Sequence, residues 1–180
     1  MVILPGSGNA APSAGFEVPL EMLAACHLRV LSQCETLQRL LPHLRTQGAD
    51  TSAQEAAQAV MRYFDTAARH HHDDEERDLF PALLAAIPDS EAAPVRALTT
   101  SLCADHRALE ASWQALRQAL EHVSQGTSGE LAPGQVSAIV QLYTRHIARE
   151  ESELLPLAAR TLEPAMLDRV GLAMRRRRGV

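Results

Sequence analysis

One segment of the chain recurs after 75 residues, and both copies place a glutamate four positions after a histidine. The first copy, residues 69–81, reads RHHHDDEERDLFP, and the second, residues 146–156, reads HIAREESELLP. Residues four apart lie on one face of a helix with Cβ atoms about 5–6 Å apart, so the imidazole and the carboxylate can reach the same ion. The repeat therefore predicts two helices, each with a chelating His-x-x-x-Glu pair.

The first copy contains three consecutive histidines, and helical geometry predicts which of them faces the core. Consecutive residues of a helix are about 100° apart, so the three cannot share a face. Phe64 and Ala67 lie on the face of His71, whereas the face of His72 is less apolar. We therefore expect His71 and Glu75 to point inward, and the alternative is the pair one residue further on.

Two other segments each carry a single histidine in an apolar stripe. His27 and His106, 79 residues apart, both have leucine four positions before them and valine or leucine three positions after them. In the second copy of the repeat, His146 and Glu150 share a face with Ile139. The chain thus consists of two similar halves, each with one single-histidine helix and one His-x-x-x-Glu helix, which is typical of a four-helix bundle with a central site.

The fold class predicted for the chain is all-α, an up-down four-helix bundle with a short C-terminal fifth helix. Alanine, leucine, glutamate and arginine are abundant, and no segment of strand length alternates. Residues 1–18, rich in Gly, Ala, Pro and Ser, are expected to form an extended or disordered arm, residues 19–162 the bundle, and residues 163–180 the short helix and a solvated basic tail, Arg175–Arg178. The four long helices are expected over roughly residues 19–45, 52–87, 90–124 and 135–161.

Charge, hydropathy and cysteine usage argue against several classes of protein. The net charge of −5 does not indicate a nucleic-acid partner, and no apolar run approaches the length of about 20 residues that spans a membrane. The N-terminus lacks the basic and apolar regions of a secretory signal. Cys26, Cys34 and Cys103 form neither a C-x-x-C pair nor an even set, so a reducing, cytoplasmic location is expected.

Six side chains from all four helices are expected to meet inside the bundle and to bind metal: His27, His71, Glu75, His106, His146 and Glu150. If both glutamates bridge two ions, each ion receives two histidines and two carboxylate oxygens, and a metal that prefers five or six ligands keeps open positions. Imidazole and carboxylate without cysteine suit iron or manganese, and also zinc. Any one of these histidines alone could be a core residue that bonds a backbone carbonyl, but an inward histidine in every helix would leave several buried polar groups unpaired unless something binds them.

Other polar residues lie close to these six positions in the sequence and are not expected to be principal metal ligands. Those off the core face should be solvated or should hydrogen-bond to the inner residues: His70, His72, Glu76 and Glu151. Asp78 and Glu153 lie on the ligand face and could accept hydrogen bonds from the ligands or form a polar mouth of the bundle. Glu110, four residues after His106, faces inward and is a further possible carboxylate ligand.

With its motifs HHxDEExxLFP and RHxxxEExxLLP, and with single histidines in DHRALE and CHLRVL, the sequence resembles the hemerythrin-like (HHE cation-binding) family over most of residues 20–160. The resemblance implies a four-helix up-down bundle with a carboxylate-bridged, usually di-iron centre, and metal ligation by the six residues named above. Oxygen-carrying hemerythrins have two histidines four apart in the third helix and His-x4-Asp in the fourth. This sequence has His106-x-x-x-Glu110 and His146-x-x-x-Glu150 instead, and the greater share of carboxylate argues against reversible oxygen carriage.

The expected function is therefore that of a non-haem protein with two iron ions that binds a small diatomic ligand such as O2 or NO, or peroxide, in a sensing, detoxification or iron-handling role. The alternative is a helical bundle in which a structural zinc or another cation supports an interaction module. The sequence has no nucleophile–base pair and no substrate-pocket signature, so enzymatic activity is left open, with redox or repair chemistry at the di-iron centre as the candidate.

Overall fold

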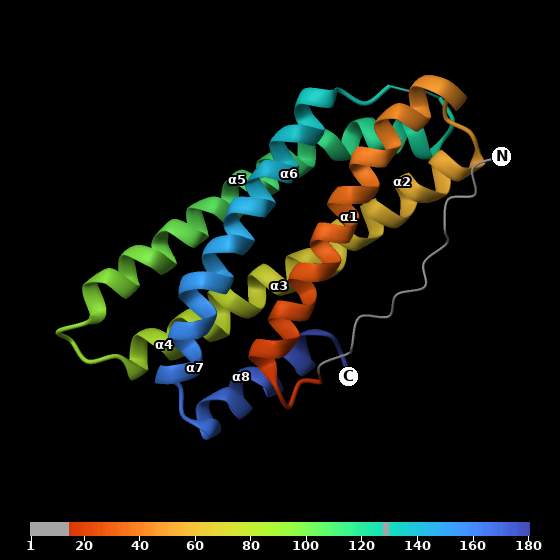
Figure 1. Ribbon diagram of the computed structural model, residues 1–180. Coiled ribbons are helices and arrows are strands. Elements are labelled where there is room, and N and C mark those ends of the chain that lie inside the picture. Colours follow the sequence, from red (N-terminus) through yellow and green to blue (C-terminus); the bar gives the residue numbers. More distant parts are fainter. Residues whose placement is uncertain (1–14, 128–129) are drawn as a thin grey trace.

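The structure is a computed structural model that describes residues 15–127 and 130–180. Within these residues all regular elements are helices, which confirms the predicted all-α fold class. Most of the predicted N-terminal arm, residues 1–14, lies outside the described residues. The long helical segments run side by side as rods, and a shorter helix lies across one end of the bundle (Figure 1).

The helical segments follow one another along the chain in this order: α1 (Pro19–Gln47), α2 (Thr51–Tyr63), η1 (Phe64–Ala68), α3 (Arg69–Asp74), η2 (Glu75–Leu79), α4 (Phe80–Ala86), α5 (Ala92–Ser124), α6 (Pro133–Arg149), η3 (Glu150–Leu154), α7 (Leu155–Thr161) and α8 (Pro164–Arg177). The second rod extends from α2 to α4 and the fourth from α6 to α7. The first rod contacts the second and the fourth, and so does the third, α5. Short connections between successive rods give the up-down order that the sequence predicted.

Local sequence signals set the turn between the first two rods. Gly48 ends α1 with a positive φ of 68°, a conformation that favours glycine. The side chain of Asp50 then caps α2 by accepting a hydrogen bond from the backbone N–H of Ala53 at 2.9 Å. His43 stabilises this cap, because its Nε2 lies 2.8 Å from Oδ1 of Asp50.

Three short segments, η1, η2 and η3, wind as π-helix, with backbone hydrogen bonds to the fifth residue rather than the fourth. Two of them, η2 and η3, are 75 residues apart and end just before the helices that contain Pro81 and Pro156 at their second positions. Since proline lacks an N–H, it removes one backbone hydrogen bond of a helix and favours a kink at its position. In the structure a π-helical segment, η2 or η3, lies directly before each of these helices. Each segment begins with the two glutamates of the repeated motif.

A polar layer divides the hydrophobic core into two clusters of buried side chains. One cluster, which includes Val30 and Phe64, fills the half of the bundle that ends at the α1–α2 turn. The other, which includes Leu23 and Met174, fills the half covered by α8. Along α1, His27 lies between the two clusters, and the same interruption occurs in each of the other rods. The bundle is therefore apolar on both sides of one internal polar layer.

The fifth helix, α8, packs on α1, α3 and η2 at one end of the bundle (Figure 1). Its approach is close at Gly171, where a Cβ atom would overlap the carbonyl oxygen of Phe16. α8 extends to Arg177, so it includes three of the four arginines that were expected to form a tail. Among the described residues, no helix combines the length and the hydropathy that a membrane span requires.

Two arginines of the basic run at the C-terminus, Arg177 and Arg178, do not form the solvated tail that the sequence suggested. Arg178 Nη2 lies 2.6 Å from Oδ2 of Asp74, and Arg177 pairs with both Asp74 and Asp78. The reason is that Asp74 is completely buried, and a buried carboxylate requires a partner of opposite charge. The last turn of α8 supplies it.

Candidate metal centre

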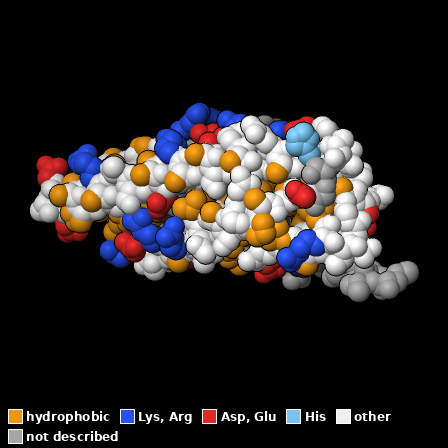
Figure 2. Space-filling model, turned by 90° about the horizontal axis from the view of Figure 1, so that it is seen from above, with side chains coloured by type: hydrophobic (Ala, Val, Ile, Leu, Met, Phe, Trp, Pro, Cys, Tyr) orange, Lys and Arg blue, Asp and Glu red, His pale blue; other side chains and the backbone are white. Residues whose placement is uncertain are grey.

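The six side chains expected to bind metal occupy the polar layer between the two hydrophobic clusters. Each is at most 2% exposed: His27, His71, Glu75, His106, His146 and Glu150. On the face seen in Figure 2, acidic and basic side chains are interspersed with apolar ones and little histidine is visible. The structure thus brings the whole predicted set together inside the bundle.

Glu150 lies at the centre of four imidazole nitrogens. Its Oε1 is 2.8 Å from Nε2 of His146 and 3.8 Å from Nε2 of His106. Its Oε2 is 3.0 Å from Nε2 of His27 and 4.0 Å from Nε2 of His71. Every histidine of the set therefore presents Nε2, the nitrogen at the tip of the ring, to the same carboxylate.

Glu75 reaches histidines from both halves of the chain. Its Oε1 is 3.7 Å from Nε2 of His71, four residues earlier on the same rod. Its Oε2 is 3.2 Å from Nε2 of His106, on α5. Glu75 and Glu150 thus face each other across the bundle axis, with histidines on both sides of them.

These atoms form two groups that share both glutamates. In each group one ligand atom per residue lies within 4.8 Å of the others, and the groups are His27, His71, Glu75 and Glu150, and Glu75, His106, His146 and Glu150. With metal–ligand bonds of about 2.0–2.2 Å, opposite ligand atoms of one ion are about 4 Å apart, so each group is close to the size of one coordination sphere. The donor set and the size of each group therefore fit a bound cation.

Unsatisfied polar atoms provide an independent test of whether a cation fits. Among the described residues, the buried side-chain nitrogens and oxygens without a hydrogen bond of normal geometry all belong to this layer, even where an imidazole nitrogen and a carboxylate oxygen lie 2.8 to 3.0 Å apart: His27 Nε2, His71 Nδ1, His72 Nε2, Glu75 Oε1 and Oε2, His146 Nδ1, and Glu150 Oε1 and Oε2. An unpaired buried polar group costs about 1–3 kcal/mol. Metal ions would satisfy both carboxylates and the inward nitrogen of His27, so the donor set fits bound cations.

Carboxylates outside the layer hold two of the histidines in place. Nδ1 of His106 lies 2.7 Å from Oε1 of Glu76, and Nδ1 of His27 lies 2.6 Å from Oε1 of Glu151. A carboxylate that accepts the Nδ1 proton orients the ring so that the lone pair of Nε2 points inward. Of the two roles that the sequence left open for Glu76 and Glu151, the structure supports hydrogen bonding to the inner residues.

The ionisation of the metal-free layer reflects its burial and its charges. Burial alone would lower the pKa of His27, but the carboxylates of Glu150 and Glu151 raise it to about 9. Burial and the neighbouring charge of His27 lower the pKa of His71 to about 3. Burial and the charge of Glu150 raise the pKa of Glu75 well above its usual range. Without metal, protons therefore occupy part of the layer.

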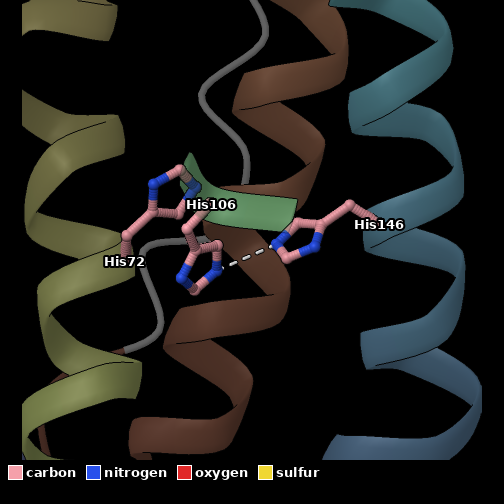
Figure 3. A group of neighbouring side chains, drawn as sticks. All are labelled: His72, His106 and His146. Atoms are coloured by element: carbon pink, nitrogen blue, oxygen red, sulfur yellow. Dashed lines mark hydrogen bonds between the residues drawn. The ribbon is translucent and has the colours of Figure 1, made fainter. Parts of the chain in front are cut away.

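His72 is placed differently from the prediction. The sequence put it off the core face, but its ring lies over that of His106, beside His146 (Figure 3). The helical wheel assumed a regular α-helix before the histidines, whereas η1 adds a π turn there and changes the register. The same turn explains why Ala68 is buried in place of the predicted Ala67.

Glu110 was a possible ligand in the sequence, and Asp74 is a buried carboxylate that the sequence analysis did not identify. Glu110 belongs to neither group, and its Oε1 accepts a hydrogen bond from Nε2 of Gln114 at 2.8 Å. Asp74 was not singled out in the sequence, although it directly precedes Glu75. The repeat contained no signal for it, because the equivalent position of the second half is Arg149, a charge of opposite sign that pairs with Asp105 at 3.0 Å.

Fold and site together define a four-helix bundle with a buried histidine and glutamate centre for cations. Residues 18–158 match the model of the hemerythrin HHE cation binding domain, and the chain belongs to this family. It is also 32% identical over 167 residues, 93% of this chain and 94% of the other, to a protein of Haemophilus influenzae (strain ATCC 51907 / DSM 11121 / KW20 / Rd) that is described as an uncharacterized protein.

Proposed function

We propose that the chain is a non-haem di-iron protein that binds a small ligand, such as O2, NO or peroxide, in a sensing, detoxification or iron-handling role. The observation that supports this most is that Glu75 and Glu150 belong to both groups of ligand atoms. A single ion would need neither two sets of histidines nor two shared carboxylates. Two ions bridged by these carboxylates would use all six side chains.

The donor chemistry supports iron in preference to a structural zinc ion. Structural zinc sites are closed, tetrahedral and usually contain cysteine. Here the layer offers imidazole and carboxylate, while Cys26, Cys34 and Cys103 are free thiols outside both groups. Four protein ligands per ion would leave positions open on a metal that prefers five or six, and a small ligand could bind there.

The residues of this chain would bind the iron, orient the histidines and keep water away from the site. Iron, when bound, supplies open coordination positions and one-electron redox chemistry. Glu76 and Glu151 keep His106 and His27 oriented through their Nδ1 protons. The hydrophobic clusters on both sides of the layer keep bulk water away, which strengthens the electrostatic interactions inside it.

We also propose a cytoplasmic location and a small molecule as the physiological partner. All three cysteines are free thiols, two of them buried, which suits a reducing compartment. The polar layer is internal, so a ligand that reaches it has to be small. We propose neither nucleic acid nor a membrane surface as a partner.

Metal analysis and absorption spectroscopy of aerobically purified protein test the proposal. We expect about two iron ions per chain. Ferric charge-transfer bands should bleach on reduction and change when NO is added to the reduced protein. Stoichiometric zinc with a featureless spectrum would support the alternative, in which the cation is structural and the bundle is an interaction module.

A further inference from the structure

A groove lies between the second rod and α8, in the half of the bundle that α8 covers. It has a volume of about 280 Å³, and the residues that line it include Arg77, Asp78, Ala82 and Ala85 of the second rod and Met166 and Arg169 of α8. None of these residues belongs to a group of metal-binding atoms in the described part of the chain. One wall is formed by α8, which begins after the matched residues 18–158. The groove is therefore separate from the polar layer, and the family match does not include all of it.

The two ends of the groove differ in chemistry. Arg177, in the last turn of α8, pairs with Asp78 near the start of the second rod's final part, so α8 runs antiparallel to that rod, from the end of the bundle toward its middle (Figure 1). Met166 and Ala82 therefore lie toward the end of the bundle. The side chains of Arg77 and Arg169 lie about one turn closer to the middle. One end of the groove is apolar and the other carries two guanidinium groups.

The charges that line the groove favour a negatively charged ligand, although the net charge of the chain is −5. The lining contains two arginines and one carboxylate, that of Asp78, which Arg177 already pairs with. Nε of Arg77 lies 3.0 Å from Oδ1 of Asp73, but both side chains are largely exposed. Exposed ion pairs of this kind are weak, so Arg77 can turn toward an incoming anion at little cost.

Arg169 has no carboxylate partner in the described part of the chain. Its Nε donates a hydrogen bond to the backbone oxygen of Ala165 at 3.3 Å, within its own helix. Both terminal nitrogens of the guanidinium group stay available. A guanidinium group binds a carboxylate through two parallel hydrogen bonds, and the charges make these bonds stronger than neutral ones. Arg169 therefore offers a carboxylate a complete binding partner at the edge of the groove.

The apolar end of the groove is open because its side chains are small. Ala82 and Ala85 lie three positions apart on one face of α4 and present only methyl groups, and Met166 faces them from α8. A volume of about 280 Å³ is at the lower limit of ligand pockets, which are about 300–1,000 Å³. The groove therefore suits a short alkyl chain, and it is too small for a helix of another protein.

We propose that this groove binds an amphipathic monocarboxylate, a fatty acid of medium chain length. Its carboxylate binds to Arg169, with Arg77 beside it, and its alkyl chain lies over Ala82, Ala85 and Met166. The ligand contacts both the second rod and α8, so its binding stabilises the docked position of α8. The site requires no metal, because none of these residues belongs to the polar layer.

Equilibrium dialysis of radiolabelled octanoate against the full chain, as purified, tests the proposal. We expect saturation at one octanoate per chain, with a Kd on the order of 1 mM, as is usual for a ligand of about ten heavy atoms in an open site. Unlabelled octanoate should displace the label. Acetate, which lacks the chain, and 1-octanol, which lacks the charge, should be at least about tenfold weaker competitors.

Two substitutions locate the site on the protein. Arg169→Gln removes the guanidinium group and Ala85→Leu fills the apolar end, and each should weaken octanoate binding about tenfold or more. Both residues are exposed, so both variants should fold, which circular dichroism establishes. The matched controls are Arg176→Gln, an exposed arginine of α8 outside the groove, and Ala111→Leu, an exposed alanine of α5. Both controls should bind like the wild type.

Several results would overturn the proposal. They are the absence of saturable octanoate binding, displacement by 1-octanol as effective as by octanoate, and wild-type affinity in both groove variants. An equal loss in Arg176→Gln and Arg169→Gln would also count against it, because the ligand would then respond only to the overall positive charge of α8.

Discussion

Glu76 accepts a hydrogen bond from Nδ1 of His106 at 2.7 Å, and it does so from a different rod of the bundle. The same relationship joins Glu151 to His27 in the other half, at 2.6 Å. The two consecutive glutamates in each copy of the repeat thus have different roles. The first glutamate faces the metal layer, and the second orients a histidine from a neighbouring rod.

Glu76→Ala should weaken metal binding although Glu76 is not a proposed ligand. Loss of such an orienting carboxylate typically costs about 10–100-fold in metal affinity. Arg107→Ala is the matched control, because it removes the ion pair to Glu76 at 2.6 Å and leaves the bond to His106. Competition with a chelator measures both variants, and equal affinity for Glu76→Ala and the wild type would show that the hydrogen bond does not orient His106.

Metal binding should release protons. In the metal-free protein the carboxylates beside His27 raise its pKa to about 9, so this residue is protonated near neutral pH, and burial raises the pKa of Glu75. Bound metal requires a neutral imidazole and an ionised carboxylate, so we expect about one proton to leave His27 per chain near pH 7, and more where Glu75 is also protonated. Calorimetric titration in buffers with different ionisation enthalpies measures this number, and proton uptake on binding would contradict the assignment.

The stability of the metal-free protein should depend on pH in two directions. The raised pKa of His27 contributes stability that is fully present below 6.5 and is lost as pH rises through about 9. The lowered pKa of His71 contributes stability that is present above 6.5 and is lost as pH falls toward about 3. Each histidine contributes a slope of up to about 1.4 kcal/mol per pH unit within its own window.

Thermal unfolding of chelator-treated protein between about pH 4 and 9 checks this profile, and we expect a maximum near the ordinary pKa of histidine. Bound metal should raise the melting temperature at neutral pH, because the assembled ligands exist only in the folded chain. This gain should shrink as acid protonates the ligands. Identical curves with and without chelator at every pH would mean that the layer binds no metal.

Much of this site could be predicted from the sequence, because side chains at positions i and i+4 lie on the same face of a helix. Their spacing alone therefore places them next to each other. The repeat located Glu75 and Glu150, and the apolar stripes located His27 and His106. The position of His72 was predicted incorrectly, because the helical-wheel projection assumed 3.6 residues per turn through a segment that contains a π turn. A single extra residue in one turn is not visible in a hydrophobic pattern.

The C-terminal contact could not be predicted for a different reason. The ion pairs of Asp74 with Arg177 and Arg178 join residues 103 and 104 positions apart. Local spacing contains no information about such pairs. Only the burial of Asp74, which depends on how α8 docks, makes them necessary.

The double substitution of Arg177 and Arg178 by Ala should destabilise the protein by about 3 kcal/mol, because it leaves the buried carboxylate of Asp74 unpaired. Urea unfolding measures the loss. Arg176→Ala is the control, since Arg176 is exposed on the same helical turn and should change stability by less than about 0.5 kcal/mol. Adding Asp74→Asn to the double variant should restore part of the loss, and equal effects of the double variant and the control would show that the tail does not stabilise Asp74.

Anomalous diffraction from iron-loaded crystals, recorded at the iron absorption edge, shows whether two ions share Glu75 and Glu150. We predict two anomalous peaks about 3–4 Å apart, with both carboxylates between them. One peak should lie beside His27 and His71 and the other beside His106 and His146. A single peak in this layer, or peaks only at the surface of the bundle, would contradict a centre of two ions.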